Sequence, residues 1–183
     1  MRLVKGTDLV RFVYQLINPA MIAVLFVGGA VGCETLGMPS TSTDPVRISD
    51  VDQEGDPARR ASLRLVDDGL AADAMGEGSR AQSRYERALQ VDASNPYAYL
   101  AIARHHIDAG QPKHALQFID RAAALFYMRG DPPLRVEVHL LGLRGGALYD
   151  SGETLSGGEL LDRARAISPK VWGDGSLSAQ ELR

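Results

Sequence analysis

Small residues return at intervals of 34 positions through the middle of this 183-residue chain. Three pairs keep this interval: Gly76 and Gly110, Ala81 and Ala115, and Ala88 and Ala122. A fixed period of roughly 20 to 50 residues is typical of proteins built from stacked units, because one unit alone cannot bury its apolar face. The period therefore predicts a repeat array.

The stretch from residue 81 to residue 126 indicates what each unit contains. Its sequence, AQSRYERALQVDASNPYAYLAIARHHIDAGQPKHALQFIDRAAALF, resembles the tetratricopeptide repeat, a helix-turn-helix unit of 34 residues. In that family, small residues stand where the two helices cross and a glycine marks the turn between them. Residues 96–129 fit this pattern best, with Ala103 and Ala115 at the crossing and Gly110 at the turn.

The resemblance implies two further units. One covers residues 62–95, and the other covers residues 138–171 after an insertion of about eight residues. In the third unit Gly157 takes the small position at the helix crossing. We therefore expect an all-α fold, a short solenoid of about three helix pairs over residues 61–171.

Residues 155–168, LSGGELLDRARAIS, also look like the signature of an ATP-binding cassette ATPase. Such an ATPase needs a Gly-x-x-x-x-Gly-Lys-Ser/Thr loop to hold the nucleotide phosphates, and the chain has no Gly-Lys pair. We therefore predict no nucleotide binding and interpret the stretch as a turn and the closing helix of the third unit. Ser156 and Glu159 have the spacing of a capping box, which predicts a helix start at this point.

The N-terminal part has the layout of a secretory signal peptide. An apolar run, MIAVLFVGGAVGC at residues 21–33, follows a segment that carries Arg2, Lys5 and Arg11. Its end, Ala-Val-Gly-Cys, resembles the lipobox of bacterial lipoproteins. That resemblance implies a cleaved signal peptide at residues 1–32 and palmitate-type acylation of Cys33. The alternative is an uncleaved membrane helix from about Phe12 to Val31, which is long enough to span a bilayer.

Residues 33–60 then contain the lipidated cysteine and a stretch rich in Ser, Thr, Asp and Pro. Such a composition buries too little apolar surface to offset chain entropy, so we expect a disordered tether. Under the lipobox interpretation, Glu34 is not the aspartate that retains some lipoproteins in the inner membrane. We therefore expect a lipid-anchored protein of the bacterial cell envelope, at the outer membrane and facing the periplasm.

The charged residues, the single cysteine and the histidines of the chain do not form a pattern typical of a catalytic or metal-binding site. After Cys33 the chain carries 17 Lys and Arg against 22 Asp and Glu, and this acidic balance does not suit a nucleic-acid partner. One cysteine allows no internal disulfide and no Cys-rich metal site. His105 and His106 are adjacent, so they do not form the i, i+4 pair of helical zinc sites. We predict no enzyme activity, no metal and no cofactor apart from the covalent lipid.

The remaining candidate is the concave wall that the first helix of each unit forms in this family. Six residues are expected on it as partner-binding residues: Tyr97, Leu100, Arg104, Asp108, His139 and Tyr149. We expect this wall to bind an apolar helix or an extended segment with an acidic group opposite Arg104, since aromatic and arginine side chains are common anchors. The alternative is that the repeats are only a spacer.

The C-terminal tail, residues 172–183, offers two alternatives. It can fold back as a cap with Trp172 as its plug, because solenoids need a cover over their last apolar face, or a partner can complete the stack there.

The function that this layout favours is a membrane-anchored adaptor that mediates protein–protein interactions in the cell envelope. The alternative is an accessory, non-catalytic subunit of a wall-remodelling, polysaccharide or secretion complex.

Overall fold

The structure is a computed structural model that describes residues 44–183. The predicted signal peptide, Cys33 and the first part of the predicted tether lie outside the described residues. Within residues 44–183, no helix is long and apolar enough to cross a membrane. These residues belong to one compact unit of the chain.

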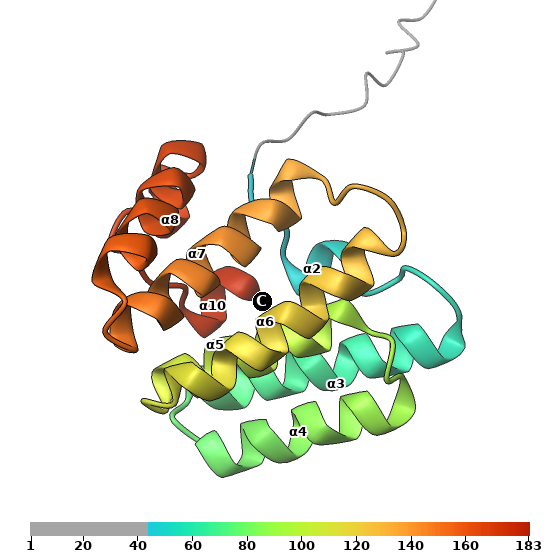
Figure 1. Ribbon diagram of the computed structural model, residues 1–183. Helices are drawn as coiled ribbons and strands as arrows, with labels where there is room; N and C mark the ends of the chain where they lie inside the picture. The colour runs from blue at the N-terminus through green and yellow to red at the C-terminus, as the bar shows by residue number, and fades with distance from the viewer. Residues whose placement is uncertain (1–43) are drawn as a thin grey trace, which may run out of the picture. The chain divides into compact units, whose positions relative to one another are not determined.

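The described residues are helical, with no β-strand among them. Six longer helices form three consecutive pairs: α3 (Pro57–Ala74) with α4 (Gly78–Val91), α5 (Pro96–Asp108) with α6 (Pro112–Tyr127), and α7 (Leu134–Asp150) with α8 (Thr154–Ile167). Three single-turn helices complete the order: α2 (Ile48–Val51), α9 (Pro169–Trp172) and α10 (Ala179–Leu182). Figure 1 shows the pairs following one another along the chain, which confirms the predicted all-α array of helix pairs.

Glycines in the left-handed region end the first helix of each pair, and they explain part of the sequence period. The φ angles of Gly76, Gly110 and Gly152 are 75°, 69° and 97°. Residues that carry a Cβ rarely adopt such positive φ angles. Each glycine reverses the chain so that the second helix of the pair can pack back on the first.

The helix crossing of the third pair depends on glycine, as predicted. A Cβ on Gly157 would lie 2.5 Å from the backbone nitrogen of Tyr149 and 2.7 Å from the carbonyl oxygen of Gly145. No side chain fits in that space, so α7 and α8 approach backbone to backbone. The predicted capping box is wrong, however, because α8 begins at Thr154 after Glu153 and Ser156 lies within its first turn.

Residues 44–60 are not the disordered tether that their composition predicts. Residues 44–51, which we name the strap, pack against the repeats and bury Val46, Ile48 and Val51. The helix α3 then begins at Pro57, and the side chain of the preceding Asp56 accepts a hydrogen bond from the backbone N–H of Arg59. The segment is polar on average, but it contains three spaced apolar side chains, and these pack into the same apolar core as the repeats.

Candidate binding surface on the inner wall

The first helices of the three pairs, α3, α5 and α7, carry the residues expected on the inner wall. Four of the six predicted partner-binding residues have 9% or less of their surface exposed: Tyr97, Leu100, Arg104 and His139. The prediction that these four form an accessible binding wall is therefore wrong for this conformation. The physical reason is that the strap and the C-terminal tail of the same chain cover them.

The strap is held by hydrogen bonds from α7. The backbone N–H of Val46 donates to the carbonyl oxygen of Arg135 at 3.0 Å, and Nε2 of His139 donates to the carbonyl oxygen of Val46 at 2.9 Å. The guanidinium of Arg135 donates to the carbonyl oxygen of Asp44 at 3.0 Å and to the carboxylate of Asp50 at 2.5 Å. These contacts fix the strap across the N-terminal half of α7.

His139 is neutral in this environment. Its side chain has no exposed surface, and burial lowers its pKa to about 4. Nε2 carries the hydrogen, because its partner is a carbonyl oxygen that only accepts. The role of His139 in the structure is therefore to hold the strap, and no free face of this residue remains for a partner.

The C-terminal tail folds back over the wall, as one of the two alternatives predicted, with Trp172 as a plug. Trp172 is 1% exposed, and Leu177, Ala179 and Leu182 are also buried. A Cβ on Gly142 would lie 2.4 Å from the indole ring, so the glycine in α7 leaves room for the plug. The short helix α10 packs against α3 and α5, on the inner wall, rather than forming a lid on the last pair.

Arg104 is already paired within the chain. Its guanidinium forms ion pairs with Asp73 of the preceding unit and with Asp108, the latter at 2.5 Å. Tyr85 donates a hydrogen bond to the same Asp73 carboxylate at 2.8 Å, and Nδ1 of His105 lies 2.9 Å from it. The expected acidic group opposite Arg104 is therefore supplied by the protein itself.

This charge network holds Asp73 ionised. Burial raises the pKa of Asp73, but hydrogen bonds from His105 and Tyr85 and the positive charge of Arg104 outweigh that effect and lower it. Burial, followed by the negative charge of Asp73, raises the pKa of Tyr85. The network joins the first and second helix pairs through side chains that are largely shielded from water.

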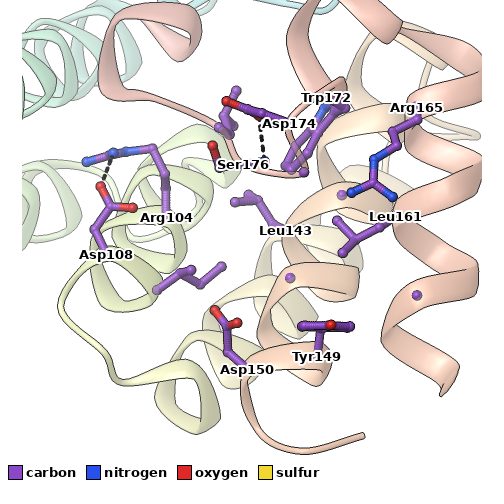
Figure 2. A pocket seen from close by; sticks show the side chains of 16 residues that line it. Arg104, Asp108, Leu143, Tyr149, Asp150, Leu161, Arg165, Trp172, Asp174 and Ser176 are labelled. Atoms are coloured by element: carbon purple, nitrogen blue, oxygen red, sulfur yellow. Dashed lines mark hydrogen bonds and ion pairs between the residues drawn. The ribbon is translucent and has the colours of Figure 1, made fainter. Parts of the chain in front are cut away.

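One part of the inner wall stays open. A cavity of about 450 Å³ lies between α5, α7, α8 and the linker that leads into α10. Figure 2 shows Arg104 and Asp108 on one side of it, Tyr149 and Asp150 at its base, Leu161 and Arg165 opposite, and Trp172, Asp174 and Ser176 above. Of the six predicted residues, Arg104, Asp108 and Tyr149 line this cavity. Arg104 is buried, whereas Asp108 and Tyr149 stay about half exposed, at 57% and 50%.

The histidine cluster on α5 and α6 has a packing role. His106 stacks on Phe118 with ring centroids 5.0 Å apart, and burial lowers the pKa of His106. His105 contacts Asp73 and the edge of the Tyr85 ring. The described residues contain no group of three or more His, Cys, Asp or Glu side chains arranged to hold a metal ion.

Sequence reasoning missed the residues that line the rest of the cavity. Arg165 of α8 and Asp174 and Ser176 of the linker come from segments interpreted only as a closing helix and a tail. The sequence GDGS at residues 173–176 could have predicted a tight turn, since glycine, aspartate and serine are typical turn residues. Nothing in the sequence period indicates that this turn lies over the inner wall.

The comparisons with known proteins agree with the helix pairs. Residues 74–127 match the family model of the tetratricopeptide repeat, which places a repeat of this family over α4, α5 and α6. Repeats of this family are typically non-catalytic modules for protein–protein interaction. Neither the comparison with curated proteins nor that with solved structures found a match for the chain.

Proposed function

We propose that this protein is a membrane-anchored adaptor, without enzyme activity, that mediates protein–protein interactions in the bacterial cell envelope. The observation that carries the proposal is the tetratricopeptide repeat with a partly open inner wall. The lipobox-like end of the N-terminal apolar run supports an anchor at Cys33, and Glu34 supports the outer membrane, with the folded unit facing the periplasm.

The partner site that we propose is the open end of the inner wall. Tyr149 offers an exposed aromatic ring, and aromatic residues are common anchors of protein interfaces. Asp108 and Arg165 place opposite charges on the two sides of the cavity. A partner segment with an apolar side chain between a cationic and an acidic group has complementary chemistry, because paired charges determine the register of a bound segment.

Site-specific cross-linking tests this proposal. A photoreactive residue at Tyr149 of the full chain, irradiated in native membranes, is expected to capture a defined envelope protein. Tyr127 is a matched control, because it is also a tyrosine, is 52% exposed and lies on α6 away from the cavity. Equal capture by both positions, or capture by neither, would contradict a partner site at the open end.

The anchor has a separate test. Replacement of Cys33 by serine is expected to abolish palmitate labelling of the full chain and to leave the precursor uncleaved. Unchanged labelling would contradict the lipid anchor. An unlabelled parent that remains in the membrane fraction would instead support the uncleaved helix from about Phe12 to Val31.

A second candidate function is an accessory, non-catalytic subunit of a wall-remodelling, polysaccharide or secretion complex in which the repeats act as a spacer. The observation that favours it is the extent to which the strap and the tail already cover the inner wall. Under this function the Tyr149 probe captures nothing, while the protein still co-purifies with its complex through another surface.

A further inference from the structure

We propose that the part of the inner wall beneath the C-terminal tail is a binding groove for a short helical segment of a partner protein, and that the tail is its resident, displaceable occupant. The partner segment has the chemistry of the tail: two small or aliphatic side chains three positions apart, followed immediately by an arginine. This inference rests on the proposed interaction function and specifies a second site, next to the open cavity.

The groove is apolar along its floor. The helices that α10 contacts, α3 and α5, carry aliphatic residues at their inner-wall positions with no exposed surface: Leu63, Val66, Leu70 and Leu100. Ala179 and Leu182 of α10 are also buried. Helices that dock in grooves place side chains three or four positions apart into the groove, and these two residues have that spacing.

The rim of the groove recognises a cation. The Arg183 guanidinium donates two hydrogen bonds to the carboxylate of Asp67 in α3, at 2.8 and 3.2 Å. The backbone N–H of Ser49, in the strap, donates to the carbonyl oxygen of Arg183 at 3.1 Å. Two-point contact between a guanidinium and a carboxylate is directional, so the rim selects an arginine and determines the direction of the bound segment.

The tail is built as a separable element. The helix α10 contains four residues and is capped by Ser178 and Glu181, whose contacts lie within the tail itself. A helix of this length is not stable alone, so it holds its shape only while docked. The linker before it contains Gly173, which is exposed, and Gly175, which is half-buried and has a φ angle of 85°. Because α10 is a single turn that belongs to none of the three helix pairs, its departure breaks no contact between the two helices of a pair.

The fit of the tail is also incomplete. The indole N–H of Trp172 and Nε of Arg104 are both buried without a hydrogen-bond partner. Burying an N–H without an acceptor opposes docking. The Arg104 N–H belongs to the wall and stays there, but a partner segment without a donor at the position of the Trp172 indole avoids that cost and has an advantage over the resident tail.

Two glycines of α7 provide a matched pair of variants for the test. A methyl group at Gly142 would meet the Trp172 ring at 2.4 Å and push out the base of the tail, whereas a methyl group at Gly146 meets nothing within 4 Å. Trp172 is the only tryptophan of the chain, so its fluorescence reports directly on the tail. The probe is a fluorescein-labelled peptide with the sequence DGSLSAQELR, residues 174–183, which has no tryptophan.

The experiment measures peptide binding by fluorescence anisotropy to the full chain in detergent micelles. In Gly142→Ala we expect red-shifted Trp172 emission and at least tenfold tighter binding of the peptide than in the parent. Gly146→Ala is expected to behave as the parent does. A peptide with Leu182→Ala and Arg183→Glu is expected to bind Gly142→Ala at least tenfold more weakly.

A second variant is needed if circular dichroism shows that Gly142→Ala has lost its helical structure. Arg183→Glu in the full chain breaks the rim contact with Asp67 and leaves the floor unchanged, so we expect it to bind the parent peptide more tightly than Arg183→Lys does. Three results overturn the proposal: red-shifted emission without peptide binding, equal binding of both peptides, or dimerisation of the variant through exchanged tails. Partner capture at Tyr149 is independent of this groove, so its presence or absence tests the proposed function separately.

Discussion

The two ends of the inner wall come from the same helices, but one end is covered by other parts of the chain and the other end is open. At one end, Tyr97 and His139 lie under the strap, and the tail covers the adjoining surface. At the other end, the C-terminal turns of α5 and α7 present Asp108 and Tyr149 to a cavity. The difference shows that helix pairs define a concave wall, whereas the segments that flank the repeats decide which part of it a partner can reach.

The largest expected effect is at Arg104, where the covered end meets the open end. Arg104→Ala leaves Asp73 buried without its main cation, and breaking a buried ion pair in this way costs about 3 to 5 kcal/mol of unfolding free energy. Arg165→Ala is the control, because its pair with Asp162 is exposed and such pairs contribute about 0 to 1 kcal/mol. Urea denaturation of both variants checks this, and similar losses would contradict the buried network.

The covered end is expected to weaken in acid. The pKa of His139 is lowered to about 4, so below the ordinary value of about 6.5 the unfolded chain binds a proton that the folded chain does not. The free energy of unfolding therefore falls as the pH decreases from 6.5 towards 4, by on the order of 2 kcal/mol at pH 5. Denaturation of the parent and of His139→Gln at pH 7 and pH 5 checks this. An equally steep pH dependence in the variant would assign the effect to another group.

At the open end, adding a methyl group to α7 is expected to stabilise the protein. Gly146→Ala meets nothing within 4 Å, and alanine is favoured over glycine inside a helix by about 1 kcal/mol. Gly142→Ala, one turn earlier, has the opposite sign, because overpacking costs about 1 to 3 kcal/mol. Thermal unfolding of the two variants measures the contrast. A destabilised Gly146→Ala would mean that the cavity is filled.

The smallest effect is expected at Tyr149. Tyr149→Ala removes a half-exposed ring that faces the cavity, so the unfolding free energy should change by no more than about 0.5 kcal/mol. Tyr97→Ala is expected to cost several times more, because the Tyr97 ring packs edge-to-face on Phe126 with centroids 5.1 Å apart. Chemical denaturation of both variants compares them. A large loss at Tyr149 would indicate that this residue stabilises the fold rather than serving as a binding surface.

The sequence predicted the helix pairs because turns and crossings depend on single local residues. Gly110 ends one helix, and Gly157 allows two helices to approach, so each leaves a visible mark in the pattern. The plug was also predictable, because Trp172 is the one aromatic residue of the tail and the largest apolar side chain in it. These features act within one unit or at its boundary.

The covered wall was not predictable from the repeat pattern. The contact between Arg104 and Asp73 joins residues 31 positions apart, and that between Arg183 and Asp67 joins residues 116 positions apart. The first pair depends on which side chains meet between two neighbouring units, and the second depends on how the tail packs on the array. The period of small residues encodes neither. The strap was concealed for a related reason: average composition predicts disorder even where three spaced apolar side chains match a wall.

The tail of this chain occupies its own inner wall, and Trp172 is the best probe of this contact because it is the one tryptophan of the chain. Acrylamide quenching of Trp172 fluorescence in the full chain measures whether the indole is shielded from solvent. We expect a blue-shifted emission that acrylamide quenches weakly, because Trp172 is 1% exposed, and a large increase in quenching on denaturation. A red emission that acrylamide quenches as efficiently in the native protein as in the denatured chain would contradict it.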